Sequence, residues 1–510
     1  MVARIAAAAL AIAAASCAAV APPPVAPVAP IAPASAPAVS AAPWGYAVVT
    51  GPEALELAIE AAIPPGPARV LSVDDGTEPF VRDVEIIAPG GERAAIEASE
   101  AVWRVPACPA GPPRRGASPG CRIRYRFLLD QAARAHDSID YAQDLGGALI
   151  SPPSAWLLRP VDGQGDPDAT RFTLRVSTPP GLAFVTGLFH APSDPGAFEA
   201  SLADLINPPY SAFGPIELRR VEVGGGAIQV ALLPGAIELG EDALLGWVTD
   251  AARSVAGYYG RYPVEHALVL ITPTRGKGPG FASALGNGGA SIMARVGRAT
   301  TREDLAESWV MTHEMLHLAF PNLERQHSWL EEGLATYVEP IARARLGMIA
   351  VDEVWRDLAF GLPKGLPMEG DRGLDNTPTW GRTYWGGALF CLLADLEIRE
   401  RTGNTRSLDD ALRGILAAGG DIAVRWEIGR ALAEGDRATG VPVLTELYAR
   451  MKDAPADVDL DALFRRLGVR FVAGQIRFDD GAPLAGVRAS ITERAGATAA
   501  ATTPAGPLTP

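Results

Sequence analysis

The pattern of apolar and polar residues divides the chain into a strand-rich part and a helix-rich part. Over residues 44–219, short β-branched and aromatic runs are separated by Pro and Gly, which is typical of strands joined by turns. The clearest runs are residues 68–73, 84–87, 123–129, 148–158 and 172–176. Only residues 138–145 are ambiguous between helix and strand. We therefore predict a β-sandwich-like N-terminal domain over residues 44–235.

A second set of apolar runs predicts an open sheet with one helix packed on it. A strand pair at residues 216–223 and 227–232 precedes a helix that begins near Glu241. Its apolar stripe follows helical spacing: Leu244, Val248, Ala251, Val255 and Tyr258. The β-branched run at residues 266–272 predicts an interior strand, and residues 290–296 an edge strand after the small residues of 276–289.

The remaining pattern is helical. Thr301 and Asp304 have capping-box spacing and Pro321 stops a helix, so we predict a helix over residues 302–320. A second helix starts near Trp329 and is kinked or ended at Pro340, and a third covers about residues 383–402. Helical periodicity continues to about residue 467. The expected fold is an α+β multidomain protein, with a catalytic domain at 236–404, a helical region at 405–475, and a β or loop segment with a disordered tail at 476–510.

Composition and charge narrow the functional classes. The 510 residues are 48% hydrophobic and 20% charged, enough apolar surface for more than one core. The net charge of -14 repels phosphate backbones, and no block of Lys or Arg offsets it. We therefore expect no nucleic-acid partner.

The N-terminus has the pattern of an export signal. Arg4 is followed by an apolar run over residues 5–15, which is shorter than the roughly 20 residues of a membrane-spanning helix. The following Ala-Ala-Ser-Cys resembles a bacterial lipobox, with Cys17 as the lipidated residue; cleavage near Ala19 without lipid is the alternative. Residues 1–17 are then a lipoprotein signal peptide, and the Ala/Pro-rich residues 18–43 a tether. We expect a periplasm-facing protein of the bacterial cell envelope, anchored to the outer membrane by lipid.

The other cysteines and two aromatic segments have structural interpretations. Cys108 and Cys121 flank a Gly/Pro-rich loop and form either a disulfide or two buried thiols. Cys391 lies in an apolar helical run and is expected in the core. Trp156 and the pair Phe189-His190 either line a cleft or belong to the core.

The chemistry centres on the HExxH motif from His313 to His317. On a helix, residues four apart leave the same face, so the two imidazoles can bind a single zinc ion. A carboxylate downstream, Glu331 or Glu332, would complete three protein ligands and leave one position for water, whose pKa zinc lowers to about 7. Glu314 lies beside the first histidine and is positioned to act as the general base on that water.

The motif and its surroundings resemble a known group of enzymes. HEMLH followed by WLEEGLATYVE resembles the gluzincin metallopeptidases, whose aminopeptidase N branch has HExxH and then EGxAxYxE. Residues 384–389 (YWGGAL) and 396–403 (LEIRERTG) are similar to a helix of the glycyl aminopeptidase family, although no PDZ-like segment follows. The resemblance implies a thermolysin-like catalytic domain and a peptide or protein substrate.

The resemblance also implies roles for single residues. It makes Glu332, immediately before Gly333, the third zinc ligand in preference to Glu331, which should point about 100° away on a helix. It places Tyr384 as the donor to the oxyanion of the tetrahedral intermediate. Thr336 either orients a ligand histidine or is an ordinary helix residue.

Two departures from the family pattern affect the expected specificity. Aminopeptidases of this group carry an acidic residue before HExxH that binds the free amine of the substrate, whereas residues 284–289 (ALGNGG) contain no acid. The 14 residues between His317 and Glu332 are fewer than in the aminopeptidase N branch. Whether the enzyme removes terminal residues or cuts internally is therefore open.

The leading hypothesis is a zinc metallopeptidase that holds peptides along the edge strand at 290–296 by strand addition. A gluzincin-fold binding lipoprotein without turnover, and a zinc hydrolase of a non-peptide amide or epoxide, are the alternatives. The substrate and the oligomeric state are not indicated by the sequence.

Overall fold

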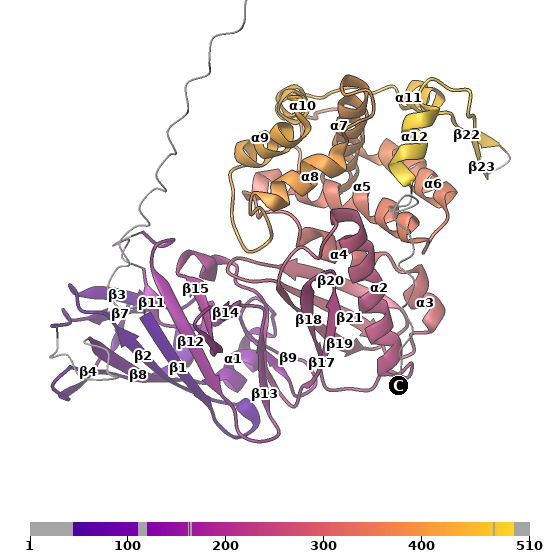
Figure 1. Cartoon of the computed structure of the whole chain (residues 1–510). Coiled ribbons are helices and arrows are strands. Elements are labelled where there is room, and N and C mark those ends of the chain that lie inside the picture. The colour runs from indigo at the N-terminus through magenta and orange to yellow at the C-terminus, as the bar shows by residue number, and fades with distance from the viewer. Residues whose placement is uncertain (1–43, 111–119, 162, 164–165, 473–474, 494–510) are drawn as a thin grey trace, which may run out of the picture. The chain divides into compact units, whose positions relative to one another are not determined.

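The computed structural model describes residues 44–110, 120–161, 163, 166–472 and 475–493 (Figure 1). The predicted signal peptide at 1–17, the tether at 18–43 and the tail at 495–510 lie outside this range. Within the described range, none of the helices combines the length and the apolar character that crossing a bilayer requires. The predicted α+β architecture is confirmed, with sheets in the N-terminal part and helices in the C-terminal part.

The N-terminal part is built from short strands, as predicted. They form one eight-stranded sheet, in the order β14-β15-β12-β1-β2-β8-β4-β5, and two four-stranded sheets. The strands are β1 (Trp44–Thr50), β2 (Leu57–Ile63), β3 (Arg69–Ser72), β4 (Val81–Ile87), β5 (Arg93–Ala95), β6 (Ala98–Ser99), β7 (Val102–Val105), β8 (Cys121–Phe127), β9 (Gln143–Asp144), β10 (Leu149–Ile150), β11 (Arg159–Pro160), β12 (Arg171–Ser177), β13 (Ala183–Thr186), β14 (His190–Ala191), β15 (Asp194–Ser201) and β16 (Ser211–Gly214). Alternate residues of β8 are buried, which is the pattern of a sheet with one face on a core.

The N-terminal part contains one unexpected element, and it also decides between alternatives that the sequence left open. A helix, α1 (Leu129–His136), follows β8 where only strands were expected, whereas residues 138–145 contain no helix. Cys108 and Cys121 form the disulfide, and Cys391 is a buried free thiol. Trp156 is fully buried and therefore belongs to the core. Phe189 and His190 instead line a groove outside the HExxH region.

A five-stranded sheet in the order β17-β18-β19-β21-β20 precedes the HExxH helix. Its strands are β17 (Glu217–Val223), β18 (Gly226–Leu232), β19 (His266–Thr274), β20 (Pro279–Leu285) and β21 (Ser291–Gly297). The predicted apolar stripe of α2 (Glu241–Tyr259) is buried. Two strands of the sheet lie before residue 236, where the sequence placed the start of the catalytic domain.

The predicted edge strand at 290–296 is wrong. β21 covers that region and lies inside the sheet, between β19 and β20. β20 is the edge, and its register with β21 shifts between Pro279 and Ala282. Small residues with low β-propensity (PGFASAL) hid this strand in the sequence.

The predicted helix at 302–320 is two helices. α3 (Arg302–Glu307) begins with the expected capping box of Thr301 and Asp304. Ser308 is extended (φ -70°, ψ 128°), and its hydroxyl accepts a hydrogen bond from the Val310 N–H at the start of α4 (Val310–His317). The break turns the chain, so that α4 is a separate element carrying the motif.

α5 (Ser328–Leu346) continues through Pro340, so of the two expectations, a kink or an end at this residue, the end is excluded. Both neighbours of this proline, Glu339 and Ile341, are buried, and packing against other helices compensates for the hydrogen bond that proline cannot form. The third predicted helix consists of a π-helical segment, η7 (Gly381–Gly386), and α7 (Gly387–Arg401).

The remaining helices form the C-terminal region (Figure 1). They are α6 (Val351–Gly361), α8 (Leu408–Ala417), α9 (Ile428–Thr439), α10 (Val443–Met451), α11 (Leu460–Leu467) and α12 (Ala485–Thr492). The helical region at 405–475 was expected, but α12 was not, because the sequence indicated only β or loop structure beyond residue 475. It follows the short hairpin of β22 (Val469–Val472) and β23 (Gln475–Phe478).

Candidate metal centre

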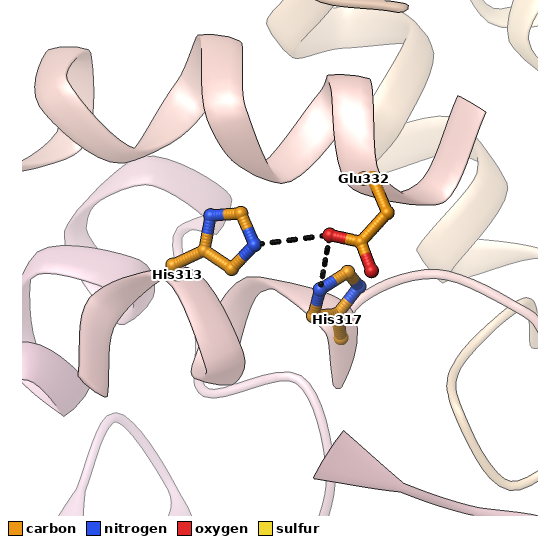
Figure 2. A group of neighbouring side chains, drawn as sticks. All are labelled: His313, His317 and Glu332. Carbon is orange, nitrogen blue, oxygen red and sulfur yellow. Dashed lines mark hydrogen bonds and ion pairs between the residues drawn. The ribbon is translucent and has the colours of Figure 1, made fainter. Parts of the chain in front are cut away.

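Three side chains from α4 and α5 converge on one point (Figure 2). Nε2 of His313 lies 3.2 Å from Oε2 of Glu332, and Nε2 of His317 lies 3.6 Å from the same oxygen. These three residues form the group of metal-ligating side chains found among the described residues, with ligand atoms all within 4.8 Å of one another. The geometry therefore fits one metal ion, with two imidazole nitrogens and one carboxylate oxygen as ligands.

The structure shows that the two candidate carboxylates, Glu331 and Glu332, have different surroundings. Glu332 points to the histidines, and the hydrogen bonds and charges of His313 and His317 overcome the effect of burial and hold its pKa well below the usual range. Glu331 turns away, and its Oε1 accepts a hydrogen bond of 3.1 Å from the Leu323 N–H in the loop between α4 and α5. Burial raises the pKa of Glu331 to about 7. Its role in the structure is to hold the loop.

Glu314 lies in the same cavity as the three ligands. Its side chain is buried, and burial raises its pKa although the charges of His317 and His313 act in the opposite direction. A carboxyl group with a raised pKa can accept and return a proton near neutral pH more readily than an exposed one. The position and environment thus suit a general base.

Tyr384 reaches the metal centre from η7. Its ring is stacked with that of His313, with centroids 6.3 Å apart, and with that of Trp380, with centroids 5.8 Å apart. Burial, then the charges of Glu332 and Glu314, raise its pKa to about 12. The phenol is therefore protonated at neutral pH and can donate a hydrogen bond.

Thr336 has a different position. It lines the larger cavity next to the metal centre, and within the described part of the chain no hydrogen bond joins it to His313 or His317. The interpretation of Thr336 as an ordinary helix residue is the one that the geometry favours.

Two glycines set the distance between α5 and the η7–α7 segment. A Cβ on Gly333 would lie 2.2 Å from the carbonyl carbon of Gly387, and a Cβ on Gly387 would lie 2.0 Å from the carbonyl oxygen of Trp329. Real side chains do not approach backbone atoms this closely, so only glycine permits the crossing. Glu332 is adjacent to Gly333, and Tyr384 lies three residues before Gly387. The crossing therefore positions both groups.

The contacts that support the start of α5 could not be predicted from the sequence. The carboxylate of Asp375 accepts hydrogen bonds from Trp329 Nε1 (2.8 Å) and Tyr448 Oη (2.7 Å), and lies 3.0 Å from His327 Nδ1. These contacts fix the first turn of α5, which leads to Glu332. Asp375 lies far from Trp329 in the sequence, so no local pattern could have identified it.

The edge strand β20 forms part of the wall of the cavity that contains the ligands. Residues 280–284 of this strand line the cavity of about 470 Å³ that contains His313, His317 and Glu332. None of the β20 residues is acidic. The acids that line this cavity are Glu314, Glu331 and Glu332, which come from α4 and α5.

The fold is similar to that of several solved structures. No protein-family model matches the chain, and none of the curated proteins matches it. An aminopeptidase N family protein from Idiomarina loihiensis matches with a TM-score of 0.60 and 14% identity, over 84% of this chain and 78% of that one. An M1 zinc metallopeptidase from Deinococcus radiodurans, solved as a mutant with a Tyr-Ser-Ala substrate, matches with a TM-score of 0.51 and 16% identity, over 81% of this chain and 94% of that one.

The chain has the fold of the M1 zinc metallopeptidases. This confirms the gluzincin-type fold that the resemblance of the motifs implied. At such low identity the likeness concerns the fold alone.

In this M1-type fold, we expect Gly387→Ala to destabilise the protein and weaken metal binding. The new Cβ collides with the backbone carbonyl of Trp329. Because a backbone atom cannot move aside as a side chain can, α5 and α7 must separate. Overpacking of this kind costs roughly 1–3 kcal/mol, and Glu332 moves with α5. The measurements are thermal unfolding and calorimetric titration with a divalent metal.

Gly246→Ala is the matched control for this substitution. Gly246 lies inside α2, and a Cβ there meets nothing within 4 Å. Removing a helix glycine should leave stability unchanged or raise it by up to about 1 kcal/mol. If Gly387→Ala and Gly246→Ala had the same unfolding temperature and the same metal affinity, the role of the helix crossing would be contradicted.

Proposed function

We propose that the protein is a zinc-dependent metallopeptidase that hydrolyses peptide or protein substrates. The observation that carries the proposal is the convergence of His313, His317 and Glu332 in one cavity that also contains Glu314 and Tyr384. The M1 zinc metallopeptidase fold supports it. The cavity thus contains a metal site, a base and a hydrogen-bond donor together.

The ligand set fits a single catalytic zinc ion. Two neutral imidazoles and one carboxylate are the ligands of many zinc hydrolases, and three protein ligands leave a fourth position open. Zinc held there would lower the pKa of a water molecule to about 7 and polarise the scissile carbonyl.

The residues around the ligands supply the proton transfers. In the proposed reaction, Glu314 takes the proton of the attacking water and returns it to the leaving amine. The protonated hydroxyl of Tyr384 donates a hydrogen bond to the oxyanion of the tetrahedral intermediate. The peptide backbone can add to the edge of β20 as a further strand. In the sequence-based hypothesis this role fell to residues 290–296, which form the interior strand β21.

Metal analysis combined with Glu314→Gln tests the proposal. The wild-type protein should contain one zinc per chain, and Glu332→Gln should lose it. Glu314→Gln should retain zinc, because Glu314 is not a ligand, while cleavage of a peptide library falls by roughly 100-fold or more. Absence of stoichiometric zinc would refute both enzymatic hypotheses and favour a binding protein. Bound zinc without peptide cleavage would favour a non-peptide hydrolase or an inactive lipoprotein.

Tyr384→Phe should lower kcat by roughly 100- to 1,000-fold, the usual effect of removing one oxyanion donor. KM and zinc content should stay near their wild-type values, since a phenylalanine ring keeps the contacts with the rings of His313 and Trp380. Steady-state kinetics on one peptide measure kcat and KM separately. A fall in zinc content, or an effect on KM alone, would exclude the proposed role.

We also propose that the protein is exported and lipid-anchored at Cys17 in the bacterial envelope. The charged start, the apolar run at residues 5–15 and the lipobox-like sequence support this. Cys17→Ser should release the protein from the membrane fraction of bacteria expressing the full chain and abolish incorporation of labelled palmitate. Unchanged fractionation and labelling of the variant would refute the anchor.

A further inference from the structure

Tyr384 lies in a helical turn of unusual width. The segment η7 (Gly381–Gly386) is π-helical, and the Gly387 N–H donates to the Arg382 carbonyl, five residues back. Turns of this kind are rare in proteins and are often found at functional sites. Because α7 continues the same segment as an α-helix, contacts outside the turn must favour the wider form.

The backbone of η7 lies directly against a short 3-10 turn, η6 (Leu362–Gly365). A Cβ on Gly381 would lie 2.3 Å from the carbonyl oxygen of Lys364. A Cβ on Gly365 would lie 2.3 Å from the amide nitrogen of Gly386. Both ends of η7 therefore touch η6 with no side chain between the two backbones.

The side chain of Arg382 attaches η7 to the same turn. Its Nη1 donates a hydrogen bond of 2.6 Å to the Gly365 carbonyl, and its Nε lies 2.8 Å from Oδ2 of Asp371. The side chain of Arg382 is 4% exposed and that of Asp371 is 2% exposed, so the ion pair is almost free of solvent. Removing one partner of a buried pair leaves an uncompensated charge and is costly.

Asp371 is itself held in place by its own loop. Its Oδ1 accepts a hydrogen bond of 2.8 Å from the Gly373 N–H, and its N–H donates to the Met368 carbonyl at 3.0 Å. Among the residues that the structure describes, Nε of Arg382 and Oδ2 of Asp371 have no aligned hydrogen-bond partner. The pair is therefore held by charge, and the Gly365 carbonyl orients the guanidinium.

Arg382 and Tyr384 point to different sides of the turn. Residues two positions apart leave nearly opposite faces of a helix, about 200° apart at the α-helical spacing. Arg382 is buried in the protein, whereas Tyr384 lines the cavity of the ligands and stacks with His313. Fixing the first side chain therefore also fixes the direction of the second.

We propose that the buried ion pair of Arg382 and Asp371 positions the Tyr384 hydroxyl by holding residues 381–386 in the π-helical form. Arg382 is then a positioning residue that contacts neither the metal nor the substrate. The role rests on the proposed function of Tyr384. Without the pair, these residues can return to the α-helical spacing. A shift by one residue rotates a side chain by about 100°, which turns Tyr384 away from His313.

The test replaces the pair by neutral side chains of similar volume. Arg382→Met combined with Asp371→Asn leaves no unpaired charge in the interior, and the asparagine oxygen can still accept from the Gly373 N–H. Neutral replacement of a buried ion pair often leaves stability nearly unchanged. The double variant should therefore fold, which circular dichroism and thermal unfolding measure before the kinetics.

Steady-state kinetics use the zinc-loaded full chain and one peptide. The double variant should lower kcat by roughly 10- to 100-fold, up to the loss expected for Tyr384→Phe, while KM and zinc content stay near wild type. Added to Tyr384→Phe, it should lower kcat further by no more than about threefold, because a positioning residue acts only through the group that it positions. Fully additive losses would overturn the inference.

Arg159 and Asp74 provide a matched control pair in the N-terminal part. Nη2 of Arg159 lies 2.6 Å from Oδ1 of Asp74, and its Nη1 donates to the Ser154 carbonyl at 2.6 Å. The contacts are thus of the same kind as those of Arg382. Arg159→Met combined with Asp74→Asn should leave kcat at the wild-type value. Equal losses of kcat in the two double variants would show a general effect of losing an ion pair and would overturn the positioning role.

Fluorine NMR gives a readout that does not depend on turnover. Fluorotyrosine incorporated at residue 384 alone should give a resonance whose chemical shift depends on the neighbouring rings of His313 and Trp380. Arg382→Met with Asp371→Asn should move this resonance towards its position in the unfolded chain, and the control pair should not. An unmoved resonance would overturn the inference. Zinc-loaded wild type that cuts no peptide would refute the peptidase function, and the resonance would still decide whether the pair positions Tyr384.

Discussion

The close crossing of α5 and the η7–α7 segment is the constraint on which the metal centre depends. Gly333 and Gly387 bring the two backbones together without intervening side chains. Glu332 and Tyr384 come from either side of this contact, one as a ligand and the other stacked on His313. The π-helical turn of η7 precedes the crossing, and such wide turns are frequent at functional sites. The geometry of the site thus follows from a backbone contact as much as from the motif.

Buried polar networks keep this crossing in place. Asp395 of α7 accepts a hydrogen bond from Tyr337 of α5 at 2.9 Å and pairs with Arg399 at 2.9 Å. It also accepts from the Leu408 N–H, at the start of α8. Asp375 acts in the same way at the first turn of α5. Because charges are costly to bury without partners, each network favours the single arrangement of helices in which all its members are satisfied.

The sequence predicted what is local and missed what depends on distant contacts. The spacing of His313 and His317 requires only one helical turn, so the ligand pair was evident, and the apolar stripe of α2 was equally readable. The break at Ser308 and the continuation through Pro340 depend on packing around those residues. β20 is hydrogen-bonded as a strand although its residues are small, because β21 provides a partner. Asp375 could be found only once the chain had folded.

The same sheet explains how the substrate backbone is held in the proposed reaction. β20 consists mainly of small residues, so its free edge leaves room for a peptide backbone close to the ligands. Phe281, the one large side chain among the β20 residues that face the site, is 56% exposed, and the Arg295 guanidinium lies 5.7 Å from its ring centroid. A backbone held by strand addition is recognised regardless of its side chains. Selectivity among side chains must therefore come from the residues that surround the metal centre outside this strand.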